Sequence, residues 1–95
     1  MLTKEENINL VIYALKLAGW SSSLIADGVI GEEAKKAVNR FTALSKLTQL
    51  HDPKSSQVNP VLLALKAGGF NDNIVADGFV GEQAVIGATA FLNLQ

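Results

Sequence analysis

Apolar residues recur along this chain at intervals of three and four positions. The first half carries two such stripes, one formed by Ile8, Val11, Ile12, Leu15 and Ala18 and a later one by Ala34, Ala37, Val38, Phe41 and Leu44. The second half repeats them with Val61, Leu62 and Leu65 and then with Ala84, Gly87, Ala88, Phe91 and Leu94. This spacing is typical of amphipathic helices, and no segment shows the sustained alternation of a strand. The pattern therefore predicts an all-α protein.

Polar residues and glycines mark where these helices begin and end. Thr3 and Glu6 form a capping-box pattern before the first helix, and Gly19 is a natural stop after it. In the second half, Asn59 followed by Pro60 predicts a helix start, because proline suits the first helical position. A polar linker at residues 51–56 separates the two halves.

The two halves are copies of one repeat. Residues 9–45 align without a gap with residues 59–95, and 14 of the 37 aligned pairs are identical. We therefore expect two tandem copies, at residues 1–50 and 51–95. Each copy is predicted to hold three helical pieces, with a short middle helix around an Asp-Gly turn. The two copies are expected to pack as one pseudo-symmetric unit.

Each copy contains the sequence Asp-Gly-x-x-Gly between its helices, starting at Asp27 and at Asp77. Gly28 and Gly78 allow a positive φ, and the aspartates can accept hydrogen bonds from nearby backbone amides. A calcium-binding EF-hand loop also has a glycine at this place. Its ligand positions, however, would fall on side chains that cannot form the required set, which are Ser23, Ile25 and Ala34 in copy one and Asn73, Val75 and Ala84 in copy two. We therefore expect turns and no metal site.

These residues resemble the small peptidoglycan-binding domain that is appended to many cell-wall hydrolases. Copy one supplies Leu15, Gly19-Trp20, Asp27-Gly28-Val29-Ile30-Gly31 and Ala37-Val38-Asn39-Arg40-Phe41 in matching order, and copy two supplies Leu65, Gly69-Phe70, Asp77-Gly78-Phe79-Val80-Gly81 and Phe91. Several polar residues of the family pattern are missing: no glutamine stands in the first helix, and Ala34 and Ala84 replace an early threonine of the last. The retained residues mostly build the core.

The resemblance implies a non-catalytic module that binds peptidoglycan or a related cell-wall glycan in a groove around the Asp-Gly turns. The candidate ligand-binding residues are Trp20, Asp27, Gly28, Phe70, Asp77 and Gly78. Trp20 could stack on a sugar ring, but its alignment with Phe70 favours a role in the core. Tyr13 aligns with Leu63 and is also expected to be packed. The alternative function is a protein–protein adaptor that keeps the fold without the glycan site.

Charge and composition exclude several other classes. The net charge of −1 divides into +1 for residues 1–50 and −2 for residues 51–95, so neither half has the basic patch that nucleic-acid binding needs. The chain has no cysteine and one histidine, His51, which lies in the linker. A catalytic zinc needs about three protein ligands, and a serine nucleophile needs a positioned base. We therefore expect no cofactor and no enzymatic activity.

The N-terminus lacks a signal-peptide pattern, and no apolar run is long enough to span a bilayer. We expect a chain that is cytoplasmic as synthesised or phage-delivered, unless it is excised from a larger secreted protein. The last helix is apolar almost all round, with Val85 and Ile86 where copy one has Lys35 and Lys36. Such a helix is expected to pack on both copies or in a homo-oligomer. A second stripe on the first helix, Leu10, Tyr13, Ala14 and Leu17, would be its partner surface.

Overall fold

A computed structural model describes residues 3–46 and 55–94, and this part of the chain is entirely helical. Its elements, in order, are α1 (Lys4–Leu17), α2 (Glu32–Ala43), the short 3-10 helix η1 (Leu44–Lys46), α3 (Ser55–Ala67) and α4 (Glu82–Leu92). The prediction of an all-α protein is confirmed. Most of the predicted linker, including His51, lies outside the described residues, while Ser55 and Ser56 already belong to α3.

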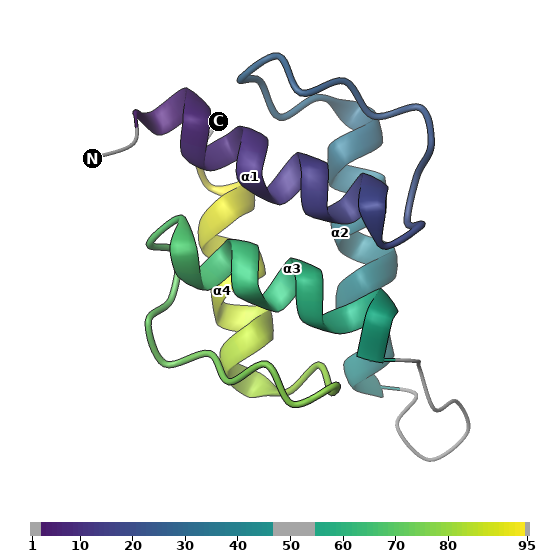
Figure 1. Ribbon diagram of the computed structural model, residues 1–95, viewed down its shortest axis with the longest axis vertical. Helices are drawn as coiled ribbons and strands as arrows, with labels where there is room; N and C mark the ends of the chain where they lie inside the picture. Colours follow the sequence, from purple (N-terminus) through teal and green to yellow (C-terminus); the bar gives the residue numbers. More distant parts are fainter. Residues whose placement is uncertain (1–2, 47–54, 95) are drawn as a thin grey trace.

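The four helices pack as one compact unit. Helix α1 lies against α3, and α2 lies against α4. Within each half the helices also contact each other, α1 with α2 and α3 with α4. In Figure 1, α1 and α3 run in opposite directions in front of α2 and α4, which are also antiparallel to each other. The core therefore lies between two layers of two helices. It includes the completely buried side chains of Phe41, Phe91, Val11 and Leu62.

The ends of α1 agree with the sequence prediction. The Thr3 hydroxyl accepts a hydrogen bond from the Glu6 amide (3.1 Å), and the Glu6 carboxylate accepts one from the Thr3 amide (2.9 Å). Two amides at the helix start are thus satisfied by side chains. At the other end, Gly19 adopts a φ of +87°, which terminates the helix.

The predicted start of α3 is wrong. The helix begins at Ser55, so that Pro60 lies inside it and Asn59 is not its cap. Proline removes one hydrogen bond from the helix. The turn before Pro60 nevertheless carries Val58, whose side chain is completely buried. Burying it stabilises the extra turn by about 1.5–3 kcal/mol, the same order as the roughly 3 kcal/mol that an interior proline costs.

The predicted middle helix of each copy is also wrong. Residues 18–31 and 68–81 form loops of turns and bends without a helix. In the first loop, Leu24 and Ile30 are buried, whereas Ile25 and Val29 are exposed. The chain is held by these inward-pointing residues, and Gly28, with its φ of +79°, interrupts any helical run. Within residues 3–46 and 55–94, each half therefore has two α-helices and no helix around its Asp-Gly turn.

The second apolar stripe of α1 is only partly covered. Ala14 is buried and Leu10 is half-buried, but Tyr13 is 61% exposed and Leu17 is 81% exposed. The prediction that Tyr13 and Leu17 are packed is therefore wrong. Helix α1 has α2 and α3 as its main neighbours, and these cover the side that carries Ile8, Val11, Ile12 and Leu15.

Helix α4 contacts both α3 and α2, so the inference that the last helix packs on both halves is confirmed. The two residues that suggested this packing, Val85 and Ile86, differ in burial. Val85 is half-buried against the core, but Ile86 is 48% exposed, so the prediction of a buried Ile86 is wrong. Their copy-one counterparts, Lys35 and Lys36, are half-buried and exposed in the same order. The buried residues of α4 are Ala84, Gly87, Ala88 and Phe91, and these form its packing face.

Candidate functional site

Two hollows open on the surface where the long loops lead into α2 and α4. The first has a volume of about 260 Å³, below the roughly 300–1,000 Å³ typical of small-molecule sites, and the second about 310 Å³, at the lower end of that range. The first is lined by Ser23, Leu24, Ile25, Asp27, Val29, Gly31, Glu32, Glu33 and Ala34. The second is lined by the residues fifty positions later, Asn73, Ile74, Val75, Asp77, Phe79, Gly81, Glu82, Gln83 and Ala84.

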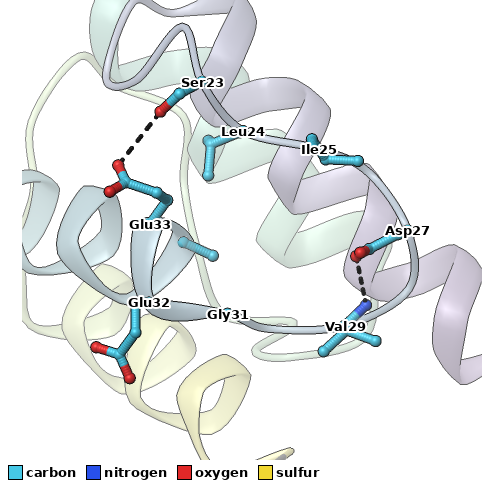
Figure 2. Close-up of a pocket in the computed structure, with 9 residues that line it drawn as sticks. Ser23, Leu24, Ile25, Asp27, Val29, Gly31, Glu32 and Glu33 are labelled. Atoms are coloured by element: carbon cyan, nitrogen blue, oxygen red, sulfur yellow. Dashed lines mark hydrogen bonds between the residues drawn. The ribbon is translucent and has the colours of Figure 1, made fainter.

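The first hollow combines an apolar floor with an apolar rim. Leu24 and Ala34 line it and are buried, so they form its floor. Ile25 and Val29 are 74% and 62% exposed, and they project from the loop that encloses the hollow (Figure 2). Large apolar side chains held this far in solvent are a feature of interaction surfaces.

Carboxylates stand on two sides of this hollow. Asp27 Oδ1 accepts a hydrogen bond from the Val29 amide (3.2 Å), which fixes the aspartate at the turn. Across the hollow, the Ser23 hydroxyl donates to Glu33 Oε2 (3.3 Å), as Figure 2 shows. Each carboxylate keeps further lone pairs that can accept hydrogen bonds. The walls of the hollow therefore favour a ligand that carries several donors.

The second hollow has the same framework; five of its nine lining residues differ from those of the first, and three of these changes alter its chemistry. Asp77 Oδ1 accepts from the Phe79 amide at 3.2 Å, as its counterpart does in the first hollow. Phe79, 57% exposed, places an aromatic ring where the first hollow has a valine. Gln83 replaces a glutamate, and its carbonyl and side-chain oxygens both accept from Asn71 Nδ2 (2.8 and 2.9 Å). An asparagine, Asn73, replaces the serine at the edge. This hollow has one carboxylate fewer in its lining and carries an exposed aromatic ring.

Both loops are anchored to the preceding helix by an asparagine. Asn9 Oδ1 in α1 accepts a hydrogen bond from the Gly28 amide, and Asn59 Oδ1 in α3 accepts one from the Gly78 amide, both at 2.7 Å. Gly28 also lies so close to α1 that an added Cβ would stand 3.0 Å from Glu5 Cβ. These contacts hold the Asp-Gly turns, and with them the rims of the hollows, at fixed positions.

The helix starts add backbone donors to the hollows. Gly31 and Gly81 are the N-cap residues of α2 and α4, and neither can provide a side-chain cap. The first amides of an α-helix have no carbonyl partner within the helix. In the first hollow, Glu32 and Glu33 belong to this first turn; their carboxylates lie 3.6 Å and 3.9 Å from the ammonium groups of Lys35 and Lys36. Each hollow thus offers amide donors beside carboxylate or carboxamide acceptors.

Of the candidate ligand-binding residues, only Asp27 and Asp77 line the hollows. Gly28 and Gly78 shape the turns behind them, with φ of +79° and +84°. Trp20 lies elsewhere: its half-buried ring meets the edge of Phe41 at a centroid distance of 5.7 Å. Its indole Nε1 donates to the Gln57 carbonyl (2.7 Å), which links the two halves.

Phe70 occupies the equivalent place in the second half. Its ring packs edge-to-face on Phe91, with centroids 5.4 Å apart. It borders a separate hollow of about 440 Å³ at the junction of the halves, together with Lys4, Asn7, Gly68, Gly69, Ala90 and Leu94. The expectation that these two aromatic residues belong to the packing of the protein agrees with both contacts.

Sequence reasoning missed the rim residues and the two anchoring asparagines. Nothing in the sequence marks Ile25, Val29, Val75 and Phe79 as rim residues, because apolar side chains are also typical of a core. A signal for the anchors was present: Asn9 and Asn59 are identical residues fifty positions apart, placed where asparagine is unfavourable for a helix. An asparagine retained in both copies at such a place indicates a side-chain hydrogen bond.

Two further findings concern metal binding and membrane spans. No cluster of three or more histidine, cysteine, aspartate or glutamate side chains is placed to hold a metal ion within residues 3–46 and 55–94. None of the helices described is long and apolar enough to cross a membrane.

The fold and its hollows define a small all-helical protein with two similar surface sites. No family model matches the sequence, and no curated protein or solved structure matches it significantly. Any assignment of function must therefore be argued from the hollows themselves.

Proposed function

We propose that this protein is a non-catalytic binding module that recognises peptidoglycan, or a related cell-wall glycan, through the two hollows. One observation carries the proposal: both hollows pair an exposed apolar rim with an aspartate and the open start of a helix, at positions fifty residues apart.

The chemistry of the hollows suits a sugar ring that carries amide substituents. A pyranose has an apolar C–H face and a rim of hydroxyl groups. Val29 or Phe79 can cover the apolar face, and an aromatic ring such as that of Phe79 is well suited to stacking. Carboxylate oxygens of Asp27 or Asp77 accept hydrogen bonds from hydroxyl groups. Helix-start amides can donate to the carbonyl of an N-acetyl group.

The proposal includes the repeat. We place one peptidoglycan-binding-like copy at residues 1–50 and a second at residues 51–95, related by a pseudo-twofold axis. The matched asparagine–glycine bonds, the matched aspartate turns and the two edge-to-face aromatic pairs support this relationship. Each copy would then contribute one hollow. A phage-encoded module would fit this role, since lysis or a virion brings such a protein to the wall.

The second candidate function is a protein–protein adaptor. The exposed Ile25 and Val29 on one rim and Val75 and Phe79 on the other favour it, because exposed apolar clusters commonly contact protein partners. A homo-oligomer through α4 belongs to the same class, with Ile86 as its exposed apolar contact and Val85 beside it. In these alternatives, the carboxylates would serve as the polar edge of a protein interface.

Sedimentation with purified sacculi tests the proposal. We expect the wild-type protein to pellet with sacculi well above an unrelated control protein at low salt. The double variant Val29→Lys with Phe79→Lys should remain in the supernatant, because it places a charge on both rims. Leu17→Lys is the matched control: Leu17 is 81% exposed and lines neither hollow, so this variant should pellet like the wild type. Absence of wild-type pelleting would exclude glycan binding and favour the adaptor.

A further inference from the structure

The two hollows lie at opposite ends of the molecule. The first opens at the start of α2 and the second at the start of α4. These helices pack side by side and run antiparallel, so their starts point in opposite directions (Figure 1). With 12 and 11 residues, they are about 18 and 16 Å long, so the hollows are separated by roughly a helix length or more. The loops that enclose them stand at the two ends of the longest dimension, which is 36 Å.

This arrangement does not form one continuous groove. The lining residues of the two hollows have no member in common, and the packed α2–α4 pair lies between them. A short segment of ligand in one hollow cannot reach the other. Each hollow therefore binds its own ligand segment.

From this geometry we infer that one chain bridges two separate strands of its ligand, one at each end. It therefore acts as a crosslinker and does not hold a single strand in both hollows. The inference rests on the proposed function, because it takes peptidoglycan strands as the ligand. Both hollows are held on one compact helical unit, so the two strands are kept apart at a fixed spacing. The anchoring bonds from Asn9 and Asn59 keep both rims rigid with respect to that unit.

The two ends are also not identical in charge. The first hollow has Asp27, Glu32 and Glu33 in its lining, and the two glutamates lie beside Lys35 and Lys36. The second has Asp77 and Glu82, with Val85 and Ile86 in place of the two lysines. Because of its aromatic rim, the second hollow is the better one for stacking on a sugar ring. The bridge is therefore expected to have one stronger and one weaker end.

Bead co-aggregation tests the inference. Two bead populations, one red and one green, are coated with the same purified peptidoglycan fragments and mixed with the protein. Flow cytometry then counts mixed-colour aggregates and the protein bound per bead. All proteins carry Ile86→Lys, which removes the exposed apolar residue of α4, and light scattering verifies that each is a single chain. The parent protein should join beads at low concentration and lose this ability in excess, because the strands on each bead are then occupied by different protein molecules and few molecules hold two beads.

The single variants Val29→Lys and Phe79→Lys each disable one hollow. We expect both to coat the beads while mixed-colour aggregates fall at least tenfold, to background, with Phe79→Lys coating more weakly. Ile25→Lys and Val75→Lys, at 74% and 69% exposure, provide a second pair on the same rims if either first variant fails to fold. Leu17→Lys should join beads like the parent.

The outcomes separate the two claims. If the parent coats beads without joining them, bridging is refuted while glycan binding stands. If a variant with one disabled hollow joins beads to the same extent as the parent, bridging through opposite hollows is also refuted. If the double variant Val29→Lys with Phe79→Lys coats the beads like the parent, the proposed binding sites themselves are wrong.

Discussion

The asparagine anchors allow a quantitative test of how the loops are held. Asn9→Ala removes the acceptor for the Gly28 amide, a part-buried bond of 2.7 Å, and Asn59→Ala does the same for Gly78. Leaving such a donor unpaired costs about 1–3 kcal/mol. Alanine is a better helix former than asparagine by about 0.6 kcal/mol, which opposes the loss. We expect each variant to be destabilised by about 0.5–2.5 kcal/mol.

The assay is thermal unfolding followed by circular dichroism. For a domain of this size, 1 kcal/mol corresponds to about 4–8 °C in Tm, so a loss near 1.5 kcal/mol lowers Tm by about 6–12 °C. Asn39→Ala, at an exposed position in α2, is the matched control and should leave Tm unchanged or slightly higher. Asn9→Asp keeps an acceptor oxygen and should recover most of the stability. If Asn9→Ala and Asn59→Ala melt like Asn39→Ala, the bonds do not anchor the loops.

Four further outcomes follow from named contacts. Gly28→Ala should lower the free energy of unfolding more than Gly19→Ala does in denaturant titrations. Both glycines have a positive φ, but an added Cβ on Gly28 would lie 3.0 Å from Glu5, whereas one on Gly19 would have no neighbour within 4 Å. Equal losses would contradict this. Trp20→Phe keeps an aromatic ring beside Phe41 but loses the bond to Gln57, so chemical denaturation should show a loss of about 0.5–1.5 kcal/mol, and no loss would mean that this link contributes nothing. Ile86→Lys should change stability by less than about 0.5 kcal/mol, as an exposed position does, while a halved mass in light scattering would reveal a homo-oligomer contact at this residue. Millimolar calcium should leave Tm unchanged, because a ligand at a hundred times its Kd would add about 2.7 kcal/mol and the turns lack the ligands to bind it.

Helical periodicity and local capping patterns were sufficient to predict much of the fold. The capping box at Thr3 and the stop at Gly19 depend on residues adjacent in sequence, and both are present. The start of α3 could not be predicted in this way. There the local preference of Pro60 for a first turn was overridden by the burial of Val58, which depends on the neighbouring helices.

Which apolar residues remain exposed also depends on neighbours. Tyr13 and Leu17 follow helical spacing as well as the core residues do, but no element of the described chain covers them. In the loops, Leu24 points inward and Ile25 outward, and no sequence rule distinguishes two adjacent aliphatic side chains. The Asp-Gly motif therefore led to Asp27 and Asp77, whereas the rim residues became visible only in the folded chain.

The central claim is that the two hollows bind a cell-wall glycan, and amide chemical shifts test it most directly. The ¹⁵N-labelled protein would be titrated with soluble muramidase-released peptidoglycan fragments, and the shifts of assigned backbone amides followed. The account predicts saturable changes confined to residues 23–34 and 73–84, the linings of the two hollows, with the second set saturating first. Saturable changes centred instead on Tyr13, Leu17 and Leu63, or no change at millimolar fragment, would contradict it.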